Sequence, residues 1–278
     1  MNYTGLTTET INEKSTAIDK MTPLEIVTLI NNEDKTVPYA IERVLPEIAL
    51  AVERITAALK NGGRLIYIGA GTSGRLGIID ATECPPTYGV SPELVQGIIA
   101  GGRDAVFRSA ENAEDSAEFG ERDLKAIGFT SADVCFGISA SGSASYVVGA
   151  LEYAGSLGAL TVALSNTEGS RIAQSADIAI TPIVGAEVIS GSTRMKAGTS
   201  QKLVLNMIST GVMIGLGRVS GNRMKYMKPS NKKLMNRAVG IVRNELGGKE
   251  YSDDEIEEAI KKAGGDITAA VGLLVKSE

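Results

Sequence analysis

The chain has 278 residues, enough for one large α/β domain with helical additions or for two small domains, and its 43% hydrophobic and 22% charged residues are typical of a folded protein. Its formal net charge of −5 lacks the overall positive charge that binding a phosphate backbone requires, so we expect no nucleic-acid partner. The chain contains no histidine, which excludes Ser–His and Cys–His catalysis within it and removes the commonest zinc ligand, so any proton transfer falls to Asp, Glu, Lys, Tyr or Cys.

Residues 1–51 are predicted to form an N-terminal helical arm. Apolar residues recur at helical spacing from Leu24 to Ile30 and again from Ile41 to Leu59, with a polar break at Asn31–Lys35. This pattern predicts two helices. Because the arm cannot bury its own apolar stripe, it favours association with a second copy of the chain.

Residues 52–219 are predicted to form an α/β domain with a doubly wound parallel sheet. Short apolar runs alternate there with helical stretches, which is the pattern of βαβ units. The five predicted strands are Leu65–Ile68, Leu94–Ile99, Val134–Ile138, Leu160–Leu164 and Ile178–Ile180. The predicted crossover helices are Ser73–Ala81, Ala110–Ala126, Ser145–Ser156 and the shorter Ser170–Ala173. Ligands of such sheets bind beyond the carboxyl ends of the strands.

Residues 220–278 are predicted to form a C-terminal helical appendage. The apolar segment before it, Leu203–Val219, contains polar residues and is shorter than the roughly 20 residues that a membrane span needs. We therefore expect a buried helix and no membrane partner. Beyond it the sequence predicts three helices, with Asp253 and Asp266 as N-caps of the last two: Asn231–Leu246, Asp253–Ala263 and Asp266–Val275.

The first residues and the cysteines indicate the cellular compartment. Met1–Thr10 is polar and lacks a basic start followed by an apolar stretch, so no signal peptide is predicted. Cys84 and Cys135 are far apart and form no CxxC motif, which fits reduced thiols. We therefore expect a cytoplasmic protein.

The first predicted strand ends in a glycine-rich turn, Gly69–Gly77. Backbone N–H groups and hydroxyls of Gly71, Thr72 and Ser73, at the start of the following helix, would form an anion site. The glycines also fit the GxGxxG spacing of dinucleotide sites. Against a dinucleotide, the second strand does not end in the acidic residue that would bind a ribose. We therefore favour a phosphate site here.

A second turn of this kind, Ser139–Ser145, follows the third predicted strand. Its serines, among them Ser139, Ser141 and Ser143, can hydrogen-bond phosphate oxygens while the next helix supplies N–H groups. An ordinary helix cap would account for one or two of these serines, but not readily for four. The pattern therefore predicts a second part of the same phosphate site.

These two turns resemble the SIS domain, a fold that binds and isomerises sugar phosphates. Two longer stretches, Arg64–Gly89 and Gly185–Lys202, are similar to the signatures of N-acetylmuramic acid 6-phosphate etherases. So are shorter stretches at Ala100–Gly102, Glu114-Asp115 and Asn231–Leu234. The similarity runs from about Thr8 to the C-terminal helices and covers nearly the whole chain. It implies a SIS-type five-stranded sheet.

The resemblance implies a homodimeric carbon–oxygen lyase of peptidoglycan recycling, which converts N-acetylmuramic acid 6-phosphate and water into N-acetylglucosamine 6-phosphate and D-lactate. By similarity, a base removes the C2 proton of the open-chain sugar, an acid protonates the departing lactate oxygen at C3, and water then adds to the unsaturated aldehyde. Two carboxylates suffice for this chemistry. No metal or organic cofactor is expected.

Glu83 and Glu114 match the acid and base positions of that family, and the resemblance assigns Glu83 as the acid and Glu114 as the base. The acid must hold a proton near neutral pH, so it needs a raised pKa. The sequence alone also allows Glu114 to belong to a solvated helix face, because acidic residues surround it. Glu83 is expected in a loop after the first crossover helix, beside Cys84-Pro85-Pro86.

A third group of polar residues precedes the long apolar helix. Considered alone, it would be a helix start with a surface cation. The resemblance makes it a lining of the substrate pocket, in which a cation offsets phosphate or lactate carboxylate charge. The residues assigned to substrate binding in this way are Glu187, Ser192, Thr193 and Lys196, and Arg194 lies among them.

Two departures from the family pattern affect this transfer of roles. The family commonly has Ser-Gly-Arg-Thr-Pro in the second turn, where this chain has Ser141-Gly142-Ser143-Ala144-Ser145. We expect Ser143 or Ser145 to compensate for the missing groups. The family's Arg-Asn pair near the N-terminus is Ile11-Asn12 here, which leaves a contact from the arm open.

Two other functions remain open from the sequence. A sugar-phosphate-sensing regulator of the same superfamily would bind its ligand without turnover, but such regulators resemble two fused SIS units and this chain is long enough for one. An aldose–ketose isomerase would need a base at C2 and no acid for a leaving group at C3. Release of lactate distinguishes the etherase from both.

Overall fold

The computed structural model describes residues 10–108, 110, 113–226 and 232–276, and its centre is a five-stranded parallel sheet with the strand order β2-β1-β3-β4-β5. The predicted strands are confirmed to within one residue at each end. Their bounds are Leu65–Gly69 (β1), Val95–Ile99 (β2), Val134–Ile138 (β3), Leu160–Leu164 (β4) and Ile178–Ile180 (β5). The strands pair in register, so that Gly69 lies opposite both Ile99 and Ile138 and the carboxyl ends form one level edge.

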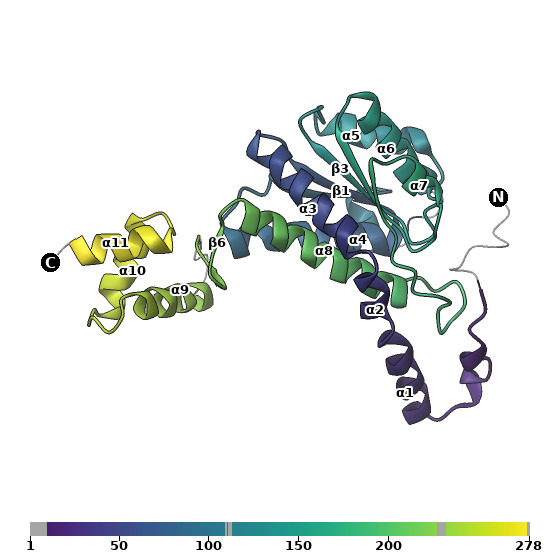
Figure 1. Ribbon diagram of the computed structural model, residues 1–278, viewed down its shortest axis with the longest axis horizontal. Helices are drawn as coiled ribbons and strands as arrows, with labels where there is room; N and C mark the ends of the chain where they lie inside the picture. The colour runs from purple at the N-terminus through teal and green to yellow at the C-terminus, as the bar shows by residue number, and fades with distance from the viewer. Residues whose placement is uncertain (1–9, 109, 111–112, 227–231, 277–278) are drawn as a thin grey trace.

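Helices cover both faces of the sheet, which confirms the doubly wound α/β fold (Figure 1). Side chains of a strand alternate between its faces. In β1, Leu65 and Tyr67 pack into one core and Ile66 and Ile68 into the other. The first core contains helices α3 (Leu45–Lys60), α4 (Gly71–Tyr88) and α8 (Lys196–Gly215); the second contains α5 (Ala117–Ala126), α6 (Ser145–Ser156) and α7 (Arg171–Gln174).

Helix α4 runs two turns beyond the predicted end at Ala81 and reaches Tyr88. The expected loop around Glu83 was therefore wrong, because Pro85 and Pro86 lie inside the helix rather than beyond it. Each proline removes one backbone hydrogen bond, to the carbonyl four residues earlier, yet the helix continues past both. The stop comes from Gly89, which is left-handed at φ 65° and donates its N–H to the Pro85 carbonyl.

Helix α5 is shorter than predicted and begins at Ala117. Ser116 precedes it as N-cap, with its side chain accepting the Phe119 N–H. Glu114 therefore lies in the turn before the helix and not on a helix face. Its carbonyl accepts the Tyr146 N–H at 2.9 Å, which fixes the turn against the start of α6.

From residue 10 onward, the N-terminal arm contains three α-helices instead of the two helices predicted: α1 (Pro23–Asp34), α2 (Val37–Glu42) and α3. Two short 3-10 helices, Glu13–Ser15 and Ile18–Lys20, precede them. The predicted polar break at Asn31–Lys35 was wrong, because Asn31 to Asp34 form the last turn of α1. Pro38 and Pro46 sit at the first turns of α2 and α3, where a missing N–H is tolerated, so each begins a new helix. Helix α3 crosses the predicted boundary at residues 51 and 52 and belongs to the first core.

The chain after α8 forms a C-terminal unit that lies away from the sheet (Figure 1). A short hairpin of β6 (Val219–Ser220) and β7 (Arg223–Met224) leads to helices α9 (Lys232–Glu245), α10 (Asp253–Lys262) and α11 (Ile267–Lys276), which share a separate core. Asn231, the predicted start of α9, lies outside the described residues. The N-cap of α10 is Ser252 and not Asp253, whereas Asp266 caps α11 as predicted by accepting the Ala269 N–H.

Helix α8 confirms the predicted buried helix but begins before Leu203, at Lys196, and ends at Gly215. Within the described ranges, the structure contains no helix with the length and apolar character to cross a membrane.

Helices α5 and α6 approach each other unusually closely, because glycines face carbonyl groups across the contact. A methyl group on Gly149 would lie 2.2 Å from the Ala117 oxygen. We predict that Gly149→Ala lowers the free energy of unfolding by about 1–3 kcal/mol through overpacking, measured by urea unfolding. Gly155→Ala is the matched control on the same helix, where nothing lies within 4 Å, and it should be neutral or slightly stabilising. Equal unfolding midpoints for the two variants would contradict the prediction.

Candidate active site

A cavity of about 260 Å³ opens at the carboxyl ends of β1 and β3. The strand register brings the two glycine- and serine-rich turns to the same edge, and residues from the Glu114 turn and from the loop before α8 close the sides. Eight of the residues predicted for the site line this cavity: Gly71, Thr72, Ser73, Glu114, Ser139, Ser141, Ser143 and Thr193.

The first turn presents the start of helix α4 to the cavity. Gly71 is left-handed at φ 53°, which turns the chain from the strand into the helix. Ser73 is buried and donates its hydroxyl hydrogen to Gln201 Oε1 at 2.9 Å, so α8 holds this side chain in place. The GxGxxG spacing has a packing cause here, because a methyl group on Gly74 would lie 2.7 Å from the Gly69 oxygen.

The second turn gathers its hydroxyl groups at the start of α6. Ser139 Oγ accepts the Gly142 N–H at 3.1 Å, and Ser141 Oγ lies 2.8 Å from Ser143 Oγ. Gly142 is left-handed at φ 66°, and a methyl group there would lie 2.3 Å from the Ser170 side chain. The turn is therefore fixed in shape and offers hydroxyls beside the N-terminus of a helix of 12 residues, an arrangement suited to a phosphate group.

Two carboxylates, Glu114 and Asp115, line the cavity next to the second turn. Both are exposed to solvent at its mouth. Among the described lining residues there is no lysine or arginine. The cavity therefore combines neutral hydrogen-bond donors with acidic groups, which can accept a proton but do not neutralise an anionic ligand.

Glu83 does not line this cavity. It is exposed on α4, ten residues after Ser73, which at the rise of an α-helix places it roughly 15 Å along the helix axis. Behind it, the buried Asp80 accepts hydrogen bonds from the Tyr67 hydroxyl at 3.1 Å and from Lys202 Nζ at 2.8 Å. This cluster fixes α4 against β1 and α8, and it leaves the Glu83 side chain on the outer surface.

The neighbouring Cys84 is unsuited to nucleophilic chemistry. Its thiol is buried, and burial together with the charge of Asp80 raises its pKa to about 12. A thiol with such a pKa is protonated near neutral pH.

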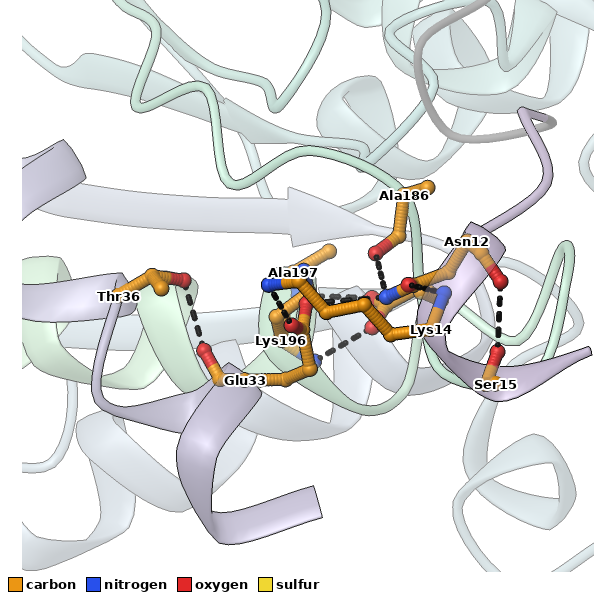
Figure 2. A network of polar contacts seen from close by, with 9 residues as sticks. Asn12, Lys14, Ser15, Glu33, Thr36, Ala186, Lys196 and Ala197 are labelled. Atoms are coloured by element: carbon orange, nitrogen blue, oxygen red, sulfur yellow. Dashed lines mark hydrogen bonds and ion pairs between the residues drawn. The ribbon is translucent and has the colours of Figure 1, made fainter. Parts of the chain in front are cut away.

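The structure places Glu187 and Lys196 in a buried network outside the cavity. Figure 2 shows Lys196 and its neighbours in this network. The Glu187 carboxylate accepts the backbone N–H groups of Lys196 and Ala197, both at 2.9 Å, and so caps the N-terminus of α8. Burial raises the pKa of Glu187, against the effect of these two hydrogen bonds. Ser192 also lies outside the described cavity lining; its backbone N–H bonds to the Ile189 carbonyl.

Lys196 is only 3% exposed and donates from Nζ to Glu33 Oε2 at 2.9 Å. Glu33 comes from α1 and is itself 5% exposed. It also accepts hydrogen bonds from Asn12 Nδ2 at 2.9 Å and Lys14 Nζ at 2.8 Å. Burial alone would raise the pKa of Glu33, but the hydrogen bonds of Lys14, Lys196 and Asn12, with the charge of Lys196, lower it to about 2.

Asn12 shows what the N-terminal arm contributes in this chain. Its amide bonds to Glu33 and also reaches the Ala186 carbonyl at 3.4 Å, whereas the preceding Ile11 is 72% exposed. The arm is thus anchored to the loop before α8 without the arginine that the family pattern would place at position 11.

Sequence reasoning did not predict every residue near the cavity. Asp115 and Gly191 line it, and Gln201 supports Ser73 from behind. Asp115 could have been found from its place beside Glu114, but no local pattern pairs Gln201 with a serine 128 positions away. Within the described ranges, no group of three or more acidic or cysteine side chains is arranged to hold a metal ion.

Comparisons with known proteins identify relatives over the full chain. Residues 47–155 match the family of glucokinase regulatory protein N-terminal SIS domains, and residues 111–210 match the SIS domain family. A protein from Clostridium beijerinckii named N-acetylmuramic acid 6-phosphate etherase is 53% identical over 99% of this chain and 90% of its own length. A protein of the same name from Escherichia fergusonii is 57% identical over 100% of this chain and 92% of its own.

Solved structures share the fold at lower sequence identity. A phosphoheptose isomerase from Francisella tularensis has a TM-score of 0.52 and 17% identity, covering 70% of this chain and 100% of that one. A phosphoheptose isomerase from Neisseria gonorrhoeae has a TM-score of 0.53 and 18% identity, covering 69% of this chain and 98% of that one. These similarities concern the sheet and its helices.

The Glu33 network predicts a specific loss of stability. We expect Glu33→Gln to lower the free energy of unfolding at pH 7 by about 3 kcal/mol, because it leaves the buried Lys196 charge without a counter-ion. Lys14→Met is the matched control: the Lys14 side chain is 71% exposed, so its loss should cost at most about 1 kcal/mol. Urea unfolding measures both.

The Glu33–Lys196 pair also predicts how the stability of the protein depends on pH. The pKa of Glu33 is lowered in the folded state to about 2. The contribution of its ionised carboxylate to the free energy of unfolding is therefore complete above the unfolded pKa near 4.3 and is lost as the pH falls towards about 2. Acid unfolding curves of Glu33→Gln should therefore be flatter than those of the wild type over this range. Identical pH profiles would contradict the ionised buried pair.

Proposed function

This chain belongs to the N-acetylmuramic acid 6-phosphate etherase family, and on that premise we propose that the cavity at the ends of β1 and β3 is its active site. The protein is a carbon–oxygen lyase of cell-wall amino-sugar recycling. It cleaves the D-lactyl ether of N-acetylmuramic acid 6-phosphate with water to give N-acetylglucosamine 6-phosphate and D-lactate. The proposal concerns which side chains bind the substrate and which move its protons.

The sugar phosphate is held by the two turns. Ser139, Ser141 and Ser143 donate hydroxyl hydrogen bonds and the start of α6 supplies N–H groups, while Thr72 and Ser73 bound the opposite side. The hydroxyl pair of Ser141 and Ser143, 2.8 Å apart, supports this placement: Ser141 matches the serine of the family's turn, and Ser143 adds a hydroxyl where the family commonly has arginine.

Glu114 is the base. It lies in the cavity beside the phosphate turn, and the bond from the Tyr146 N–H to its backbone carbonyl holds its main chain against the start of α6. It removes the C2 proton of the open-chain sugar, the C3–oxygen bond breaks, and the acid protonates the lactate oxygen. Water then adds its oxygen to C3 of the unsaturated aldehyde and gives one proton to the acid, while Glu114 returns a proton to C2.

Glu83 is the acid, supplied by a second copy of the chain. The observation behind this step is that Glu83 is exposed on α4, away from the cavity of its own chain. Several large apolar side chains on the arm are also exposed, which supports a homodimer: Leu24 at 75%, Val27 at 57% and Tyr39 at 66%. Two copies related by a two-fold axis would place the Glu83 of each beside the cavity of the other.

We further propose a cytoplasmic enzyme with no nucleic-acid partner. The two buried, unpaired cysteines support the cytoplasmic location. The net charge of −5 supports the absence of a nucleic-acid partner. Between the alternatives, the names of relatives at 52–57% identity favour the etherase over a regulator or an isomerase.

Isotope exchange can distinguish the acid from the base among the two carboxylates. If Glu83 only protonates the leaving oxygen, Glu83→Gln should lower lactate release by roughly 10²–10⁴-fold yet retain exchange of the product's C2 proton in heavy water. Glu114→Gln should lose both activities. NMR follows the deuterium at C2. Exchange that survives only in Glu114→Gln would reverse the roles, and wild-type lactate release by both variants would remove both residues from the mechanism.

The shared site predicts complementation between inactive variants. In a 1:1 mixture of Glu83→Gln and Glu114→Gln subunits, half of the dimers are mixed and each has one intact site, so about a quarter of wild-type activity should return. Glu83→Gln mixed with the double variant is the control and should stay inactive. If the first mixture also stays inactive while subunits exchange, both glutamates act within one chain.

A further inference from the structure

The charge of the cavity does not match the charge of the substrate. N-acetylmuramic acid 6-phosphate carries a phosphate and a lactyl carboxylate, both anionic near neutral pH. Hydroxyl groups and helix N–H groups can bind the phosphate. The described lining adds two carboxylates, Glu114 and Asp115, and no cation. A lactyl carboxylate placed beside these acids would be repelled unless a cation stood next to it.

The first candidate for that cation, Lys196, is already engaged. It is buried, lies outside the cavity and forms an ion pair with Glu33 at 2.9 Å. Figure 2 shows the two residues within one network of polar contacts. Arg75, near the start of α4, is engaged as well, because its guanidinium donates to the carbonyls of Ala105, Val106 and Arg108. Withdrawing Lys196 would leave the buried Glu33 carboxylate without one of its partners, and withdrawing Arg75 would break three hydrogen bonds to backbone carbonyls.

Arg194 lies in the same loop as Lys196, but its side chain is exposed. Its neighbour Thr193 lines the cavity, and so does Gly191. The Thr193 carbonyl accepts the Gly198 N–H at 2.9 Å, and the position of a methyl group on Gly198 lies 3.5 Å from Thr72 Cγ2. The backbone that carries Arg194 is therefore held beside the first turn.

Among the described residues, no carboxylate forms an ion pair with Arg194. A guanidinium binds a carboxylate through two parallel hydrogen bonds and keeps its charge at any relevant pH. We propose that Arg194 binds the lactyl carboxylate of the substrate and thereby makes the enzyme specific for a carboxylated ether. This inference rests on the cavity being the active site.

Binding by Arg194 would also orient the leaving group. Held at its carboxylate, the lactyl group cannot rotate freely about the ether bond, so its oxygen stays directed at the acid while Glu114 works at C2. Arg194 is thus a specificity-determining residue, and the contact exists before and after the C3–oxygen bond breaks.

The test compares two ligands that differ in the carboxylate. N-acetylmuramic acid 6-phosphate has it, whereas the product N-acetylglucosamine 6-phosphate lacks it and serves as a competitive inhibitor. For Arg194→Met we expect KM for the substrate to rise roughly 30-fold or more, with Ki for the product changed by less than about threefold. Arg194→Lys should recover part of the loss, because it restores the charge without the two-pronged geometry.

Ser141→Ala is the matched control, because a phosphate contact is common to both ligands. It should raise KM and Ki by similar factors. Arg194 is exposed, so an unchanged melting temperature establishes that Arg194→Met is folded. An Arg194→Met variant that raises Ki as much as KM, or that changes neither, overturns the inference. A wild-type protein that releases no lactate would instead remove the proposed function, so the two failures are distinguishable.

Discussion

The in-register pairing of parallel strands is the constraint on which the rest of this structure depends. Because Gly69 lies level with Ile138, the two turns that follow β1 and β3 leave the sheet at the same height and face each other across one cavity. The helices that begin there, α4 and α6, point their N-terminal N–H groups at the same space. A shift of one residue in either strand would separate the turns and exchange the two faces of the core.

The buried pair of Glu33 and Lys196 transmits that constraint to the N-terminal arm. A lysine that is 3% exposed requires a counter-ion, and the carboxylate that provides it comes from α1, 163 positions away. Glu187 caps the same helix start, and Asn12 joins Glu33 to the loop that bears Thr193. The loop beside the cavity is therefore held in place by residues that do not line the cavity themselves.

The sequence predicts the sheet well, but it predicts the partners of the buried charged side chains poorly. The central strands β1 and β3 are buried at every position and their apolar runs mark them clearly, and the shorter apolar segments of the other three strands suffice to predict them as well. The predicted end of α4 is wrong because prolines usually stop a helix, whereas Pro85 and Pro86 lie inside this one. The predicted arm lacks one helix because the helical spacing from Ile41 to Leu59 runs across Pro46, which begins a new helix. The predicted substrate contacts of Glu187 and Lys196 stay predictions, although both side chains have partners within the protein. Glu33, the partner of Lys196, lies 163 positions away in the sequence, where no spacing rule applies. Glu187 bonds to backbone N–H groups of Lys196 and Ala197, a helix-capping role that its side chain alone does not indicate.

The separate core of the C-terminal unit has a consequence for how the molecule unfolds. Val242, Ile260 and Leu274 pack with one another and not with the side chains beneath the sheet, so the loss of one core leaves the contacts of the other intact. Cooperativity extends only as far as shared packing. The C-terminal unit can therefore unfold separately from the sheet, and the heat absorption of the protein on melting should be broader than a single two-state transition of 278 residues would give.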